Sequence, residues 1–117
     1  MTDNINHPTH YNSRNIGYEC IILAKYQSFC IGNTIKYLWR CQSKGKPLED
    51  LEKARWYARL AALRHEQTYT TSTCGIILHR LVRTTEGLEQ TVWNGIRTSN
   101  WRTVIKTLDQ MIKETSE

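Results

Sequence analysis

The chain has 117 residues, of which 39% are hydrophobic, and its four Trp and six Tyr allow one folded domain with a modest core rather than a disordered tail. Sixteen Lys and Arg against eleven Asp and Glu give a net charge of +5, which favours anionic partners such as nucleotides, nucleic acid or an acidic protein. No apolar run approaches the roughly 18 residues of a membrane span, and the first residues do not resemble a signal peptide, so we expect a cytoplasmic protein with no membrane partner.

Residues 1–15 predict a polar N-terminal arm, because they are rich in Asn, His and Thr and contain a proline that opposes an early helix. The two histidines of the arm offer imidazole groups to a metal ion, but a zinc or iron site needs three or four ligands, and the acid that could join them is Glu19. We predict no metal site there. Instead, three side chains of the arm are expected to fold over a cleft and to bind a ligand or the helix ends: His7, His10 and Tyr11.

A first helix is expected over residues 16–29, with one apolar side. Glu19 interrupts that side and is the one acidic residue between Asp3 and Glu49. It is either an exposed helical glutamate, or a group that orients a cation of the next helix or acts as a general base.

The second expected helix starts after Gly32 and runs to about residue 43. At roughly 100° per residue, apolar side chains share one side of it and polar groups cover the other. The polar side holds Asn33, Lys36, Tyr37, Arg40 and Lys44. An ordinary solvated helix mixes acids with bases, whereas this set has no acid and suits a phosphate-bearing ligand; a basic surface that aids solubility is the alternative. The glycine before it also allows the backbone to approach a phosphate closely.

A third helix is expected over residues 48–67, after a turn at 44–47 that lacks the Walker pattern of a phosphate loop. Polar residues line up along it at i, i+3, i+7 and i+14, namely Asp50, Lys53, Tyr57 and Arg64. The polar sides of the two helices can therefore face each other across one cleft. The third helix also carries two apolar stripes and four alanines, so we expect it to be sandwiched within the domain or between subunits of an oligomer.

The rest of the chain predicts more helices and no competing strand. A linker over residues 68–75 precedes short helices at about 76–82 and 88–96, and Ser99 or Asn100 caps a last helix. The four cysteines show no CxxC pair or zinc-ribbon spacing and are expected to be reduced, packed thiols.

These patterns predict an all-α fold: a single compact domain of five or six helices that forms a homo-oligomer. The expected parts are an arm at 1–15, a three-helix core at 16–67 and a helical extension of the same domain at 68–117.

Three motifs occur in order, with Lys44 between the last two: His7-Pro8-x-His10-Tyr11, Gly32-Asn33-x-x-Lys36-Tyr37-x-x-Arg40 and Asp50-Leu51-x-Lys53-Ala54-x-x-Tyr57. Over about residues 4–65 the chain resembles a family of small bacteriophage proteins. One member of that family is a nucleotide kinase that phosphorylates deoxynucleoside monophosphates, lacks a P-loop and forms a large oligomer. The resemblance implies a nucleotide-binding protein in the host cytoplasm, with the motif residues around the ligand.

If the chain is an enzyme, the resemblance implies a nucleoside monophosphate kinase without a P-loop. Phosphoryl transfer mainly requires positive charge on the transferred oxygens and aligned reactants. Lys36, Arg40, Lys44 and Lys53 would supply that charge. Asp50 or Glu19 would hold Mg²⁺ together with the nucleotide phosphates, and the catalytic set would be Lys36, Arg40 and Asp50.

The same residues would also suit a protein that binds a nucleotide and leaves it unchanged. Cations, an amide and aromatic rings for base stacking suffice for this, the candidate rings being Tyr37, Trp39 and Tyr57. A phage could use such a sponge to sequester a nucleotide immune signal of its bacterial host. Dispersed arginines leave nucleic acid as a third partner, which the modest charge and the lack of a helix-turn-helix signature disfavour.

Overall fold

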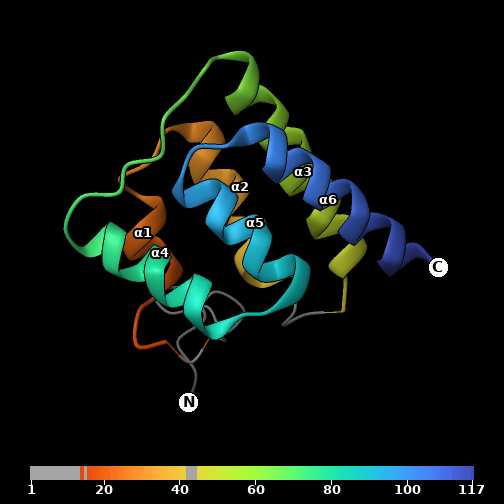
Figure 1. Cartoon of the computed structure of the whole chain (residues 1–117), viewed down its shortest axis with the longest axis horizontal. Coiled ribbons are helices and arrows are strands. Elements are labelled where there is room, and N and C mark those ends of the chain that lie inside the picture. Colours follow the sequence, from red (N-terminus) through yellow and green to blue (C-terminus); the bar gives the residue numbers. More distant parts are fainter. Residues whose placement is uncertain (1–13, 15, 42–44) are drawn as a thin grey trace.

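The computed structural model describes residue 14 and residues 16–41 and 45–117. This part of the chain forms six helices and no strand, which confirms the predicted all-α fold (Figure 1). The helices are α1 (Cys20–Ala24), α2 (Phe29–Arg40), α3 (Pro47–Leu63), α4 (Thr73–Thr84), α5 (Gly87–Arg97) and α6 (Trp101–Ser116). None of these helices is both long and apolar enough to cross a bilayer.

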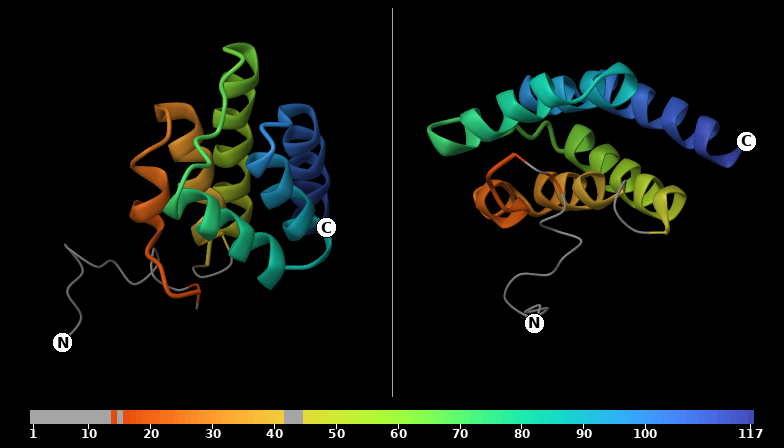
Figure 2. Two further views of the ribbon diagram at one scale, coloured as in Figure 1. Left: turned by 60° about the vertical axis from the view of Figure 1, so that its left-hand side comes forward. Right: turned by 90° about the horizontal axis from the view of Figure 1, so that it is seen from below.

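The helices form two layers with one core between them. Seen from below, α1, α2 and α3 make one layer and α4, α5 and α6 make the other (Figure 2). The layers meet where α3 packs along α6 and α1 packs against α4. Apolar side chains of both layers are fully buried in the core, among them Leu23, Ile31, Ile35, Ile77, Leu81 and Leu108. The C-terminal half is therefore a second layer of the same globule.

The first two helices begin and end at different residues from those predicted. α1 has only five residues, and α2 starts at Phe29 rather than after Gly32. Ser28 caps α2, because its side chain accepts a hydrogen bond from Ile31 N at 3.1 Å. Gly32 thus lies inside the first turns of α2, where an added Cβ would stand 3.2 Å from the carbonyl oxygen of Ala24. Its small size allows the end of α1 to approach α2 closely.

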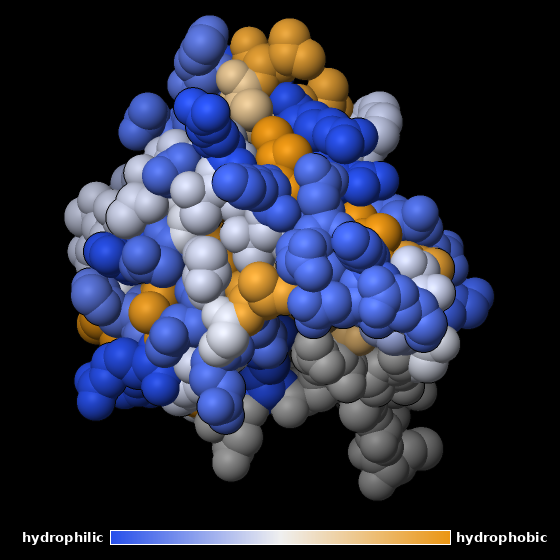
Figure 3. Space-filling view, turned by 45° about the vertical axis from the view of Figure 1, so that its right-hand side comes forward, coloured by the Kyte–Doolittle hydropathy of each residue, from blue (hydrophilic) through white to orange (hydrophobic). Residues whose placement is uncertain are grey.

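The predicted sandwiching of α3 occurs within the chain. Its buried side is made of small residues, with Ala54, Ala58 and Ala61 fully buried, and the helix packs between α2 and α6. In the second apolar stripe, Trp56 is 57% and Leu63 76% accessible, whereas Leu60 is partly buried against the core. Figure 3 shows a mainly hydrophilic surface on this side of the molecule, with apolar atoms gathered where α3 ends.

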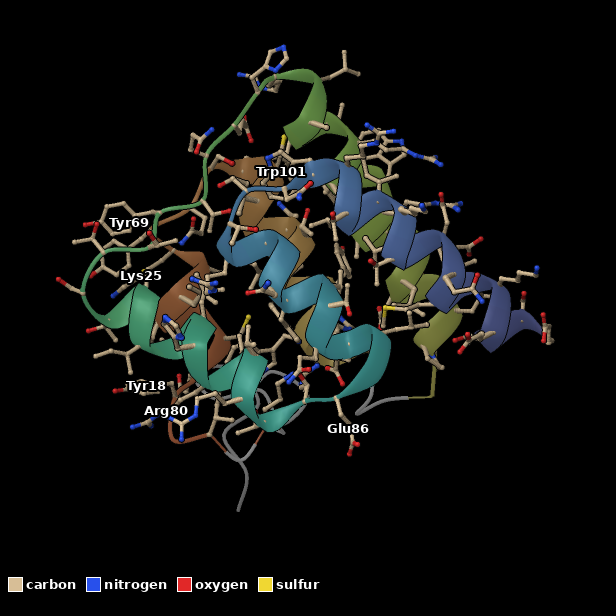
Figure 4. The ribbon with its side chains drawn as sticks, viewed as in Figure 1. Tyr18, Lys25, Tyr69, Arg80, Glu86 and Trp101 are labelled. Atoms are coloured by element: carbon tan, nitrogen blue, oxygen red, sulfur yellow. The ribbon has the colours of Figure 1, made fainter. Side chains whose placement is uncertain are left out.

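Two long-range contacts fix the connecting segments to the helices. Arg80 of α4 donates to the carbonyl oxygen of Ile16 at 3.0 Å, and its guanidinium lies 5.2 Å from the ring centroid of Tyr18 (Figure 4). Trp101, at the start of α6, donates from Nε1 to the carbonyl oxygen of Glu66 at 2.7 Å. The segment after α3 is therefore part of the packed structure and not a free linker.

Candidate functional site

Side chains of α2 and α3 come together on the outer surface of the first layer. On α2, Thr34, Ile35, Leu38 and Trp39 are buried. Of the polar residues predicted to oppose them, the described ones are partly exposed: Asn33, Lys36, Tyr37 and Arg40. We call the outward surface the α2–α3 face and define it by Asn33, Lys36, Tyr37, Lys53 and Tyr57.

The centre of the α2–α3 face is a stack of two tyrosines between two lysines. The rings of Tyr37 and Tyr57 are nearly parallel, with an interplanar angle of 9° and centroids 6.1 Å apart. Lys36 Nζ lies 4.5 Å and Lys53 Nζ 5.3 Å from the centroid of Tyr37. Both distances are within the range of a cation–π interaction. The geometry therefore concentrates positive charge around one aromatic ring.

The two lysines differ in their ionic partners. Lys53 Nζ lies 2.9 Å from Glu49 Oε1, and this hydrogen bond raises the pKa of Lys53 and lowers the pKa of Glu49. Lys36 has no carboxylate of a described residue within ion-pair distance. Lys36 is thus the cation of the face that is best placed to bind an added anion.

Arg40 and Asp50 make an ion pair where α2 ends and α3 begins. Arg40 Nε lies 3.4 Å from Asp50 Oδ1, and the side chain of Asp50 is only 3% accessible. Its second oxygen, Oδ2, accepts no hydrogen bond from any described residue. The carboxylate of Asp50 is thus buried beside Arg40, and the catalytic role predicted for it stays a prediction.

The other predicted site residues are distributed as follows. Asn33 Nδ2 donates a hydrogen bond to the carbonyl oxygen of Phe29 at 2.8 Å, and the side-chain oxygen of Asn33 takes no part in this bond. Arg64 pairs with Glu66 at 2.9 Å beyond the end of α3. Glu19 is the N-cap residue of α1 rather than part of that helix. The predicted contributions of His7, His10, Tyr11 and Lys44 lie outside the described residues.

Among the described residues, α2 and α3 are in direct contact where a cleft between them was expected. The Tyr37–Tyr57 stack and the Arg40–Asp50 pair join the two helices directly. A ligand would therefore lie on the face rather than between the helices. Within the part of the chain that the structure describes, no three His, Cys, Asp or Glu side chains are grouped so that they could hold a metal ion.

Sequence reasoning missed two exposed aromatic rings beside the face. Phe29 is 74% and Trp56 57% accessible. Each meets Tyr57 edge-on, with centroids 5.7 Å away for Phe29 and 5.1 Å away for Trp56. The helical spacing of Phe29 with Asn33, Lys36 and Tyr37 would have indicated its position, had the start of α2 been known.

A second missed feature is a half-buried ion pair between the layers. Arg14 binds the carboxylate of Glu89 on α5, and donates to the carbonyl oxygens of Leu38 and Trp39 at 3.1 Å each. Its guanidinium lies 5.4 Å from the ring centroid of Trp93. Arg14 therefore satisfies carbonyl groups at the end of α2 while it joins that end to α5.

All four cysteines are free and buried, as the sequence predicted. Burial raises the pKa of Cys20 and Cys41 to about 12, from an ordinary value of 9.0. In the unfolded chain these two thiols ionise near the ordinary pKa of 9.0, whereas in the folded chain they stay protonated to a higher pH. Burial of the protonated thiols therefore contributes fully to stability below pH 9, and this contribution is lost as the pH rises toward 12.

We expect native protein at neutral pH to resist iodoacetamide, and urea-unfolded protein to react at all four thiols. Rapid labelling of a native thiol, detected by mass spectrometry, would contradict this burial.

Residues 5–59 match the model of a family described as a protein of unknown function (DUF3310). Those residues are similar to this family. The matched segment contains α1, α2 and most of α3, and hence the whole α2–α3 face. No curated protein and no solved structure matches the chain. The match assigns no activity to the face.

Proposed function

We propose that the α2–α3 face binds a phosphorylated nucleotide. The observation that carries this proposal is the position of Lys36 and Lys53 about Tyr37, with Tyr57 stacked against the same ring. Lysines offer donors and charge to phosphate oxygens, and aromatic rings offer a surface to a base. The net charge of +5 would assist the approach of an anion.

The burial of Asp50 favours binding without turnover. A kinase would have to align two substrates, and Asp50, one of the two carboxylates that were expected to hold Mg²⁺, is paired with Arg40 and buried, whereas the other is Glu19. The proposed role is therefore that of a sponge, which would keep a nucleotide signal of a bacterial host from its receptor if the protein is encoded by a phage. Nucleoside monophosphate kinase activity, implied by the resemblance to the phage family, is the second candidate.

Lys36→Ala should weaken nucleotide binding by roughly tenfold to a hundredfold, because a hydrogen bond to a charged group contributes about 1.5–3 kcal/mol. Binding of ATP and of nucleoside monophosphates to the full chain would be measured by calorimetry. The matched control is Lys106→Ala, which removes the same charge from an exposed position on α6. Equal losses in both variants would mean that net charge alone attracts the nucleotide, and would contradict a site on this face.

Catalysis and sequestration are separated by the fate of the nucleotide. The protein would be incubated with nucleoside monophosphates, ATP and Mg²⁺, and the nucleotides would be chromatographed before and after the protein is denatured. We expect retained nucleotide to be released unchanged. New diphosphate that disappears in Lys36→Ala would instead establish the kinase.

A further inference from the structure

The α2–α3 face has two chemically different ends. Around Tyr37 it is cationic, with Lys36 and Lys53 close to the ring. Around Tyr57 it is aromatic, because Phe29 and Trp56 each lie edge-on to that ring. The Tyr37–Tyr57 stack joins the two ends without a gap. A molecule lying along the face would therefore meet positive charge at one end and exposed rings at the other.

We infer that Phe29 and Trp56 are a base-stacking site, and that the ligand class is a nucleotide with a purine base rather than a simple phosphate or a sugar phosphate. This inference rests on the proposed function, since the lysines must hold the phosphates. The phosphates lie at the Tyr37 end and the base stacks on the exposed rings at the Tyr57 end. Larger bases bury more apolar area, so purines bind more tightly than pyrimidines.

The exposure of the two rings supports a ligand rather than the core as their partner. Phe29 is 74% accessible and Trp56 57%, although aromatic side chains usually bury most of their surface. Leu63 is equally exposed on α3 but has no ring and lies at the end of the helix. The charge of the adjacent lysines is complementary to nucleotide phosphates, which distinguishes this surface from a purely apolar interface between copies of the chain.

Trp56 provides a direct optical probe of this site. The other three tryptophans are buried, with Trp39 and Trp93 0% and Trp101 7% accessible, so acrylamide should quench mainly the fluorescence of Trp56. ATP should protect Trp56 from the quencher, whereas inorganic tripolyphosphate, which has no base, should leave quenching unchanged. UTP should protect less than ATP at equal occupancy.

Substitution at Trp56 tests the contribution of the base to affinity separately from that of the phosphates. Trp56→Ala should weaken ATP binding by roughly five- to 150-fold, the range expected from about 1–3 kcal/mol per stacked base, and should leave tripolyphosphate binding unchanged. Trp56→Phe should retain most of the affinity for ATP. Leu63→Ala is the control, because it truncates an exposed apolar residue on the same helix and should change neither affinity.

Three outcomes would overturn the inference. If tripolyphosphate binds as tightly as ATP and Trp56→Ala changes neither affinity, the rings do not contact a base, while the proposed function stands. If wild-type protein binds neither probe, the proposed function fails and the inference fails with it. If Trp56→Ala and Leu63→Ala both dissociate an oligomer in light scattering and leave base discrimination unchanged, the rings contact a second copy instead.

Discussion

Arg40→Ala should lower the free energy of unfolding by about 3 kcal/mol, because it would leave the carboxylate of Asp50 buried without its cation. The two groups are 3.4 Å apart, and their side chains are 25% and 3% accessible, respectively. Removing the charge from the more exposed partner thus leaves the less exposed one uncompensated. Urea denaturation followed by circular dichroism would measure the loss from the shift in the transition midpoint.

A double substitution tests whether the loss arises from the pair. Arg40→Met combined with Asp50→Leu removes both charges and should recover a large part of the stability, since apolar residues can replace a buried ion pair with little cost. The free energy of unfolding of Arg40→Lys should lie between that of wild type and that of Arg40→Ala. A stability of Arg40→Ala within about 0.5 kcal/mol of wild type would show that Asp50 does not depend on Arg40.

The Arg40–Asp50 pair also changes how variants of the α2–α3 face should be interpreted. The sequence places Arg40 among the cations expected to bind the ligand. Because the guanidinium pairs with a buried carboxylate, a loss of binding in Arg40→Ala would combine unfolding with lost contacts. Lys36, whose described contact is with the ring of Tyr37, gives the clearer test of binding.

The sequence was most informative about which side of a helix each side chain occupies, because position along a helix determines this. The spacing of Lys36, Tyr37 and Arg40 places them on one side of any helix that contains them, so the outward face could be predicted without knowing the fold. The start of that helix was predicted wrongly. The helix was expected to start after Gly32, whereas Ser28 provides the cap and the small size of Gly32 allows the close approach of α1.

Contacts between distant segments could not be predicted from spacing. Arg14 and Glu89 are 75 residues apart, and no local pattern marks either as the partner of the other. The same holds for Asp50, which looks like an available acid on a polar stripe and becomes a buried partner only when α3 packs against α2. Charge patterns show which groups are present, whereas packing decides which of them remain available to a ligand.

The burial of Trp39 by a distant segment likewise could not be predicted from its spacing in the sequence. Trp39 was a candidate for base stacking, yet it is 0% accessible and lies between the layers. Its ring meets Trp93 of α5 edge-on, with centroids 6.4 Å apart. The guanidinium of Arg14 lies 5.9 Å from its centroid. A buried indole in this position stabilises the contact between α2 and α5, and it cannot reach a ligand on the outer face.

Trp39→Ala should accordingly lower the free energy of unfolding by about 3–5 kcal/mol, the usual cost of truncating a buried Trp. Trp39→Phe keeps a ring against Trp93 and should cost less, and it remains measurable if the alanine variant does not fold. Urea denaturation of both variants would test this order. A loss below about 1 kcal/mol in Trp39→Ala would contradict its place in the core.

The comparison of Trp39 with Trp56 then separates folding from binding. Trp39→Phe should reduce stability and leave ATP affinity unchanged wherever the variant is folded, because its ring does not reach the α2–α3 face. Trp56→Ala should do the reverse, since its side chain is 57% accessible and contributes little to the core. If instead both variants lose stability and affinity in proportion, the face would depend on the core so closely that neither ring could be assigned to the ligand.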